Sequence, residues 1–185
     1  MKTQATTLFN GKFLKVVTRK GWEFVRRKDC SGIVVIAAMT AAKKVLFVEQ
    51  HRIPLGKNVI ELPAGLVGDL CHSRKESMAT AAKRELLEET GYRARRMRFI
   101  MEGPVSSGMS SQQIAFYRAE GLTKEHEGGG DESEDIQVHE VPFQKAHAWL
   151  VTMQRQGLLV DPKVYAGLFF LNSPWSTVDR PQKKR

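Results

Sequence analysis

The stretch 61–92 constrains the fold of this chain most strongly, because it combines helical periodicity with a row of acidic side chains. From Ser77 onward, its apolar residues recur at the spacing of one helix face. These residues are Met78, Ala81, Ala82 and Leu86. Two capping patterns fit the start, either Ser73 with Glu76 or Ser77 itself. Gly91 suits the left-handed residue that ends many helices, so the sequence predicts an amphipathic helix that begins near Ser77.

The polar side of this helix carries three carboxylates. Glu85 and Glu89 share a face, and Glu88 borders it. Crowded carboxylates repel one another, and a divalent ion with oxygen ligands is the usual way to hold them together. Arg84 precedes Glu88 by one helical turn and can stabilise the helix by an ion pair. The alternative is a solvated acidic face, although acidic groups near a helix C-terminus interact unfavourably with the helix dipole.

Periodicity elsewhere predicts several strands and two further helices. Residues 8–28 alternate around Gly21 and are typical of a hairpin. The β-branched run at 31–39 is typical of a strand buried on both faces, and residues 45–50 are expected to form its antiparallel neighbour. Further strands are predicted at 93–100, 113–119 and 136–142. Further helices are predicted at 142–156 and 164–171, and the second of them is expected to start with Pro162 as its first helical residue.

Composition limits the partners and the compartment. The net charge of +9 attracts polyanions such as RNA, but no RNA-recognition motif accompanies it. Phosphate-bearing small molecules, or solubility alone, explain a basic surface equally well. The longest apolar run, 32–39, is far shorter than the roughly 20 residues of a membrane span, so no membrane partner is expected. The absence of a signal-peptide pattern, and cysteines at Cys30 and Cys71 only, favour a reducing cytoplasm.

The acidic helix and the segment before it resemble a known family. The positions Glu76, Arg84, Glu85, Glu88, Glu89 and Gly91 together resemble the Nudix box. The preceding residues 61–65, Glu-Leu-Pro-Ala-Gly, are similar to the ADP-sugar pyrophosphatase branch of that family. Two features depart from the usual pattern. The loop between Gly65 and Glu76 is longer and contains Cys71 and His72, and Tyr92 replaces an aliphatic residue.

The resemblance implies an α/β fold, the Nudix α/β/α sandwich with a mixed sheet plus an N-terminal antiparallel sheet. It implies an N-terminal β-hairpin or sheet at residues 1–28, a Nudix hydrolase domain at 29–172 and a polar tail at 173–185. In the resembling enzymes the N-terminal strands are exchanged between two subunits. A homodimer is therefore expected for this chain.

The same resemblance implies metal-dependent hydrolysis of the pyrophosphate bond of a nucleoside diphosphate sugar, ADP-ribose or a related one. Nucleoside monophosphate and sugar phosphate would be the products. Mg²⁺ is the expected ion from its oxygen preference, and Mn²⁺ fits the same ligands. The implied metal ligands are the backbone carbonyl of Ala64 and the carboxylates of Glu85, Glu88 and Glu89. The implied catalytic residues are Glu134, Glu88 and Arg84.

Substrate-binding residues are implied in the N-terminal hairpin and around the strand ends. Trp22 offers a base a large π face, and Arg27, with Glu23 nearby, is a candidate contact to phosphate or base. Arg52 has the planar, always-charged fork that holds a phosphate. Glu61 is expected to bind the nucleoside half or to assist the metal site. For each, the structural alternative stays open: a core aromatic, a solvated arginine or an edge-strand charge.

The second acidic stretch, 124–135, contains three consecutive glycines and is predicted to be a mobile loop. In the resembling branch a glutamate of this loop closes over the substrate as base or extra metal ligand. Glu134 fits that place best and Glu132 second, and a glycine-hinged loop suits a lid that completes the site when substrate binds. The alternative is a floppy acidic turn.

Two other activities stay open, and the exact substrate is not fixed. ADP-ribose pyrophosphatases often have Ser-Pro-Gly where this chain has Ser106-Ser107-Gly108, which leaves room for a guanosine or uridine diphosphate sugar. The basic charge favours a dinucleoside polyphosphate or the 5′ end of RNA as substrate, although nucleic acid is not the expected partner. A non-catalytic nucleotide sensor is the second alternative, and the intact set of glutamates argues against it.

Overall fold

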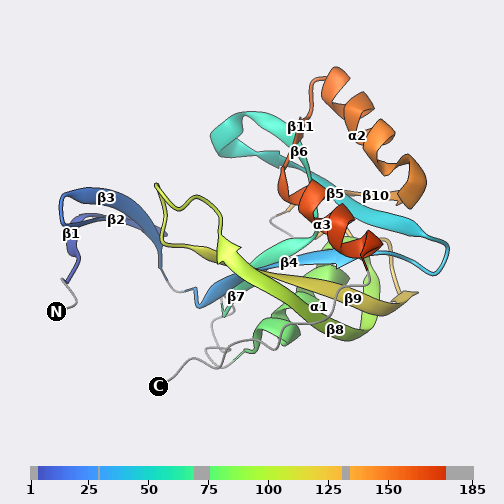
Figure 1. Cartoon of the computed structure of the whole chain (residues 1–185), viewed down its shortest axis with the longest axis horizontal. Helices are drawn as coiled ribbons and strands as arrows, with labels where there is room; N and C mark the ends of the chain where they lie inside the picture. Colours follow the sequence, from blue (N-terminus) through green and yellow to red (C-terminus); the bar gives the residue numbers. More distant parts are fainter. Residues whose placement is uncertain (1–3, 29, 69–75, 131–133, 174–185) are drawn as a thin grey trace.

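The computed structural model describes residues 4–28, 30–68, 76–130 and 134–173, and Figure 1 shows its elements along the chain. The N-terminal strands are β1 (Thr6–Asn10), β2 (Leu14–Arg19) and β3 (Trp22–Arg27). Next come β4 (Gly32–Ala38), β5 (Lys44–Arg52), β6 (Lys57–Glu61), β7 (Ala64–Val67) and helix α1 (Met78–Thr90). They are followed by β8 (Tyr92–Pro104), β9 (Gln113–Lys124), β10 (Ile136–Pro142), α2 (Ala146–Arg155), β11 (Leu159–Val160) and α3 (Lys163–Asn172). Short 3-10 helices occupy Ile53–Leu55 and Phe143–Lys145.

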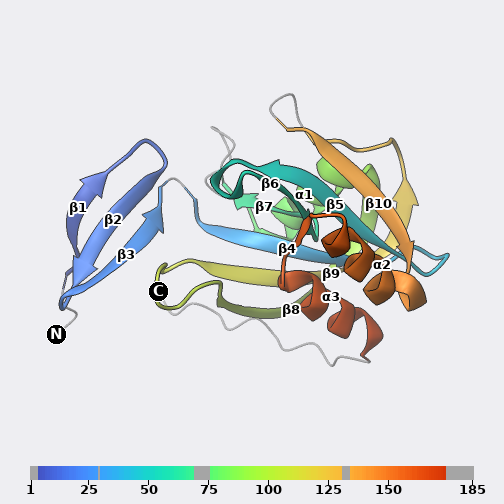
Figure 2. The same cartoon turned by 90° about the horizontal axis from the view of Figure 1, so that it is seen from above.

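The first three strands form an antiparallel sheet that lies to one side of the other elements in both views (Figures 1 and 2). A tight turn joins β2 to β3, and its central residues Lys20 and Gly21 have φ angles of 54° and 78°. Positive φ at both positions matches the twist of a two-residue hairpin. The predicted hairpin is confirmed, and β1 is an additional strand that pairs with β2. The domain boundaries at residues 28 and 172 stay a prediction.

Two four-stranded sheets follow among the described residues, ordered β10-β5-β6-β11 and β7-β4-β9-β8. The second sheet is mixed, because β4 runs parallel to β9 and antiparallel to β7. Helix α1 packs on β7, β4 and β8, whereas α3 packs on β4, β6 and β9, and α2 on β10 and β11. The expected α/β sandwich with a mixed sheet and an N-terminal antiparallel sheet is confirmed.

Alternate residues of β4 face two different cores. Val34 and Ile36 belong to the core that includes the apolar side of α1. Val35 and Ala37 belong to the core that includes residues of α2 and α3. All four are completely buried, which confirms the prediction of a strand covered on both faces. This strand therefore fixes α1 on one side of the sheet and the two C-terminal helices on the other.

The prediction that residues 45–50 pair with the strand at 31–39 is wrong. β5 pairs instead with β6 and β10, and an isolated bridge from Met39 to Val45 marks the point where the two strands diverge. Both edges of β4 are occupied by β7 and β9, so the chain crosses to the other sheet. Adjacency in sequence favoured a simple hairpin, and the tertiary structure overrides it.

The two C-terminal helices lie close to where periodicity placed them. α2 begins at Ala146 because Phe143–Lys145 form a 3-10 turn first, and α3 begins directly after Pro162. None of the helices in the described part of the chain is long and apolar enough to cross a membrane. The predicted polar tail, apart from Ser173, lies outside the described residues.

Candidate active site on helix α1

Helix α1 has well-defined ends. Ser77 is its N-cap, and the Ser77 hydroxyl accepts a hydrogen bond from the Thr80 backbone N–H at 3.1 Å. Gly91 has a φ of 73°, and its N–H donates to the Leu87 carbonyl at 2.8 Å. The alternative cap, Ser73, lies outside the described residues. These ends set the helical register, which turns Glu85 and Glu89 towards the sheet.

Glu85 and Glu89 are buried, with exposed fractions of 8% and 2%. The Glu85 carboxylate lies so close to Gly65 that a Cβ at Gly65 would overlap it. The Glu89 Oε2 atom accepts a hydrogen bond from the Ala64 backbone N–H at 3.1 Å. Both carboxylates therefore face β7, where the Pro-Ala-Gly segment brings backbone close to the helix. The solvated acidic face that the sequence left open does not describe these two residues.

Arg84 links the acidic residues around it. Its guanidinium contacts Glu76 Oε1 at 3.2 Å, Glu85 Oε1 at 2.9 Å and Glu88 Oε2 at 2.9 Å. It also donates a hydrogen bond to the Leu66 carbonyl at 3.2 Å. Burial disfavours the arginine charge, but the hydrogen bond to Glu76 and the charge of Glu85 raise its pKa overall. The ion pair expected between Arg84 and Glu88 is present and belongs to a larger cluster.

Burial dominates the electrostatics of Glu89. Desolvation raises the pKa of this carboxyl well above its ordinary value, the Ala64 N–H opposes the rise, and the charges of Glu85 and Glu134 add to it. A cation beside the carboxylates would reverse this effect, because a nearby opposite charge favours the ionised form. Arg52 already acts on Glu89 in that sense.

The donor types at this site suit a hard divalent ion, since carboxylates and backbone carbonyls are the ligands that Mg²⁺ and Mn²⁺ prefer. In the described ranges, however, no three acidic, histidine or cysteine side chains are arranged so that they could hold an ion. Glu85 and Glu88 both turn towards Arg84. Each of these contacts engages one of the two oxygens of its carboxylate, so the groups that would hold an ion are also ion-paired with Arg84.

Arg52 and Glu61 form a second charged element beside this site. Arg52 Nη2 lies 2.6 Å from Glu61 Oε2, and the strands that carry the two residues pair directly. Burial raises the pKa of Glu61, Arg52 opposes the rise and Asp161 adds to it. No sequence pattern indicated a role for Asp161, which reaches this place because β11 runs parallel to β6. Arg52 therefore pairs with Glu61, and its positive charge also acts to lower the pKa of Glu89.

The N-terminal sheet presents Trp22 and Arg27 in different ways. Trp22 is 64% exposed, and its indole N–H donates to the Gly108 carbonyl at 3.0 Å. The alternative of a core aromatic is therefore wrong. Glu23 is the neighbouring exposed residue of the same strand. Arg27 lines a polar cavity of about 250 Å³ at the junction between the N-terminal sheet and the sandwich.

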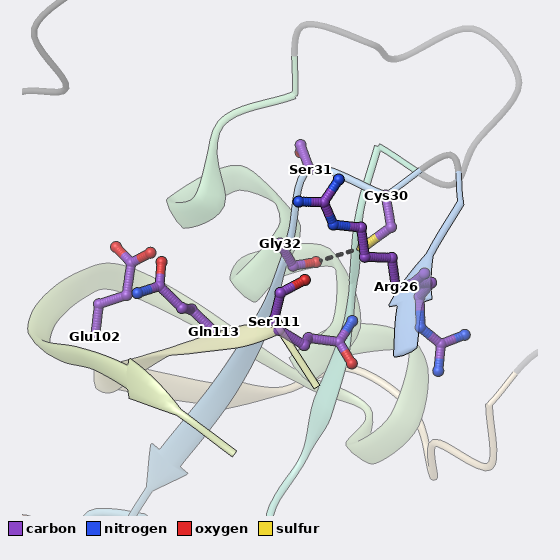
Figure 3. A pocket seen from close by; sticks show the side chains of 9 residues that line it. Arg26, Cys30, Ser31, Gly32, Glu102, Ser111 and Gln113 are labelled. Carbon is purple, nitrogen blue, oxygen red and sulfur yellow. Dashed lines mark hydrogen bonds between the residues drawn. The ribbon is translucent and has the colours of Figure 1, made fainter. Parts of the chain in front are cut away.

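Figure 3 shows this cavity from close by, with Arg26, Glu102 and Gln113 among the side chains that line it. None of the α1 glutamates lines the cavity. Gly32 of the cavity wall belongs to β4, on which α1 packs, and a Cβ at Gly32 would meet the Met78 side chain of α1. Gly32 and Val34 are two positions apart on β4, and Val34 pairs with Gly65. Two strand residues span roughly 7 Å, so the cavity wall at Gly32 lies that far along β4 from the position that pairs with Gly65.

The acidic loop after β9 is held against the end of α1. The N–H groups of Gly129 and Gly130 donate to the carbonyls of Glu89 and Glu88 at 3.0 and 3.1 Å. These glycines are therefore hydrogen-bonded to α1, and the mobility of the loop and its closure over a substrate stay predictions. Glu134 is exposed, and its charge acts on Glu89. The other candidate of this loop, the glutamate at position 132, lies outside the described residues.

Comparison with known proteins agrees with this arrangement. The family model described as NUDIX domain matches residues 31–160. A GDP-mannose pyrophosphatase of Cronobacter sakazakii (strain ATCC BAA-894) is 31% identical over 160 residues, which cover 80% of this chain and 78% of that protein. An ADP-ribose pyrophosphatase of Bacillus subtilis (strain 168) is 34% identical over 116 residues, covering 62% of this chain and 60% of the relative.

Two further similarities complete the comparison. The methanol dehydrogenase activator of Bacillus methanolicus is 35% identical over 116 residues, 62% of this chain, and the match spans 60% of that relative's length. A solved structure described as an ADP compounds hydrolase superposes with a TM-score of 0.63 and 19% identity, covering 91% of this chain and 89% of the other. This structural likeness concerns the fold.

Proposed function

This chain belongs to the NUDIX family, and we propose that it hydrolyses the pyrophosphate bond of a nucleoside diphosphate sugar in a reaction that requires a divalent metal ion. The relatives named GDP-mannose pyrophosphatase and ADP-ribose pyrophosphatase support a substrate of this class. The products are a nucleoside monophosphate and a sugar phosphate. Membership in this family of hydrolases makes the chain an enzyme that acts on phosphorus-containing anhydrides.

One observation carries this proposal, the burial of Glu85 and Glu89 side by side against the backbone of β7. Two adjacent carboxylates in a desolvated place cost free energy unless a cation accompanies them. A binding module that recognises a nucleotide by its base has no need of such a pair. Arg84 offsets part of the charge of Glu85, and Mg²⁺ that arrives with the diphosphate substrate would add positive charge beside Glu89.

Each residue has a role that follows from its chemistry. Glu85, Glu89, Glu88 and the Ala64 carbonyl are the groups that would hold Mg²⁺, or Mn²⁺ in its place. When bound, the ion neutralises charge on the phosphates and lowers the pKa of a bound water. Glu134 is the candidate base for that water, and Arg84 orients Glu85 and Glu88 by its two contacts at 2.9 Å.

The diphosphate and nucleoside need separate contacts. Arg52 is the candidate phosphate ligand, because its positive charge is close enough to Glu89 to lower the pKa of that carboxyl. The ion pair with Glu61 holds its guanidinium in place. The cavity beside Arg27 includes Gly32, which lies roughly 7 Å along β4 from the residue that pairs with Gly65. This spacing suits the nucleoside half of the substrate, and Trp22 and Glu23 lie exposed at the start of β3, the strand that also carries Arg27.

A homodimer completes the proposal. The N-terminal sheet carries a series of exposed apolar side chains, Leu8, Phe9, Phe13, Leu14 and Trp22. Such a concentration on one small sheet is unusual for a surface that stays in water. We expect this sheet to contact a second copy of the chain, and light scattering on the purified protein measures the mass directly.

The decisive experiment is a panel of nucleoside diphosphate sugars, including ADP-ribose and GDP-mannose, incubated with Mg²⁺ or Mn²⁺ and analysed for released monophosphate. Dinucleoside polyphosphates and a 5′-triphosphorylated oligonucleotide belong in the same panel. Metal-dependent release from a diphosphate sugar supports the proposal. Preference for the oligonucleotide with strong salt dependence would favour RNA ends instead, and nucleotide binding without turnover would favour a sensor.

A further inference from the structure

The segment 125–130 lies on the C-terminal end of α1 and forms a continuous set of backbone hydrogen bonds with it. The Glu125 N–H donates to the Gly91 carbonyl at 2.8 Å. Gly129 and Gly130 then donate to the carbonyls of Glu89 and Glu88. The last carbonyls of a helix have no partner within the helix, so this segment supplies partners from outside. The backbone of two candidate metal ligands is thereby joined to the acidic loop.

Gly128 lies directly against the backbone of α1 in this contact. Its φ is +77°, and an added Cβ would lie 2.5 Å from the Glu89 carbonyl oxygen and 2.6 Å from the Thr90 carbonyl carbon. Both neighbours are backbone atoms of α1, so they cannot rotate away as a side chain would. Any residue other than glycine would have to lift the segment from the helix.

Glu134 is connected to the same contact from the other side. The Ile136 N–H donates to the Gly129 carbonyl at 3.3 Å. A Cβ at Gly130 would lie 2.6 Å from Glu134 Oε2, so the glutamate side chain rests directly over this glycine. Gly129 and Gly130 are hydrogen-bonded to α1 and the Glu134 side chain lies over Gly130, so a shift of this segment relative to α1 would move Glu134 relative to the helix glutamates.

The ion pairs made by this loop hold it more weakly than the backbone contact does. Arg93 pairs with Glu125, and Lys124 Nζ lies 2.8 Å from Glu127 Oε2, but both pairs are largely exposed to solvent. Exposed ion pairs contribute little to holding a geometry. The backbone contact at Gly128 is the firmer restraint.

We propose that Gly128 is a positioning residue: by lacking a Cβ it lets segment 125–130 lie on α1, which sets the distance between Glu134 and the pair Glu85 and Glu89. This inference rests on the proposed function. Its chemical consequence is that the loop base and the carboxylate pair act as one unit. A shift of about 1 Å between groups that must cooperate can cost roughly 10²-fold in rate.

The test compares Gly128→Ala with Gly157→Ala. Both glycines have positive φ, so both substitutions introduce backbone strain, but a Cβ at Gly157 meets nothing within 4 Å. We expect Gly128→Ala to lower kcat by roughly 10- to 100-fold with little change in KM, and Gly157→Ala to keep kcat. Equal kcat values in the two variants would overturn the proposal.

A double-mutant cycle with Glu134→Gln separates positioning from general destabilisation. If Gly128 acts through Glu134, the Gly128→Ala substitution costs little further activity once Glu134 is already Gln. Additive losses would contradict the inference. Gly130→Ala provides a second probe, since the nearest atoms to its Cβ belong to Glu134 and Ile136, and it should show the same non-additivity even if Gly128→Ala folds poorly.

Two readouts keep this inference distinct from the proposed function. Mn²⁺ binding, measured by electron paramagnetic resonance without substrate, should be weakened less than 3-fold or so by Gly128→Ala, because the metal ligands on α1 stay in register. Wild-type protein that hydrolyses no diphosphate sugar would defeat the proposed function. Wild-type activity with an unaffected Gly128→Ala variant would defeat only the inference about Gly128.

Discussion

The carboxylate of Glu85 lies against the α-carbon of Gly65, in a space that would be filled by the β-carbon of any other residue. This contact joins α1 to β7 at the centre of the proposed active site. Burial of the carboxylate therefore depends on a glycine at the end of the Glu-Leu-Pro-Ala-Gly segment. The relationship explains why that segment and the acidic helix form a single functional unit.

Replacing Gly65 by alanine should displace Glu85 and lower kcat by roughly 10²-fold. Gly103→Ala is the matched control, since Gly103 also lies in a strand without positive φ and its Cβ would meet only the Met101 methyl group at 3.4 Å. Steady-state kinetics on both variants checks this expectation. A Gly65→Ala enzyme with wild-type kcat would show that Glu85 does not need its present position.

Glu89→Gln should lower kcat by at least about 10²-fold, the loss typical for removal of a group that stabilises charge. The amide keeps the shape of the side chain and removes its charge, so the fold should persist. Glu120→Gln is a suitable control, because Glu120 pairs with Arg98 on the surface, away from α1. Full activity of Glu89→Gln would mean that the metal assignment is wrong.

Mg²⁺ or Mn²⁺ alone should raise the thermal unfolding midpoint of the wild-type protein, because an ion that binds only the folded state stabilises it. At about 100 times its Kd the ion contributes about 2.7 kcal/mol. The double variant Glu85→Gln/Glu89→Gln should lose this shift. Differential scanning calorimetry with and without EDTA measures it, and an equal shift in both proteins would place the ion elsewhere.

Arg27→Ala should raise KM about 10-fold and leave kcat nearly unchanged, since a contact to a remote part of the substrate stabilises ground state and transition state alike. Arg19→Ala tests whether general positive charge is responsible, because Arg19 is exposed on the same sheet and does not line the cavity. Equal effects of the two substitutions would argue for nonspecific attraction of a polyanion.

Tyr92→Phe should destabilise the protein by about 1 kcal/mol at pH 7, because the Tyr92 hydroxyl donates to Glu140 Oε1 at 2.7 Å. This hydrogen bond lowers the pKa of Glu140 below its ordinary value of 4.5. A lowered carboxyl pKa contributes stability above pH 4.5 that is lost as the pH falls through the folded-state pKa.

The difference between wild type and Tyr92→Phe should therefore shrink on acidification below pH 4.5, as measured by urea unfolding. Burial is the leading cause that raises the pKa of Tyr92 itself to about 12, so the tyrosine stays a donor throughout this range. A difference independent of pH would show that lost packing, rather than the hydrogen bond, is responsible.

Local patterns predicted much of this molecule. The helix that carries Glu85 and Glu89 follows from apolar spacing and from the left-handed preference of Gly91, both of which act within a few residues. The two-sided burial of β4 follows from its unbroken β-branched run. These features depend on neighbours in the chain, and they agree with the structure for that reason.

Tertiary contacts decided the rest. β5 joined the sheet β10-β5-β6-β11 because both edges of β4 were taken, which no local pattern reveals. Asp161 came beside Glu61, and Gly128 onto α1, through contacts between residues far apart in the chain. The sequence alone determined which side chains bear charge and which helix face they share. Only the folded chain decided which of them lose water and which backbone meets them, because burial is a property of the assembled layers.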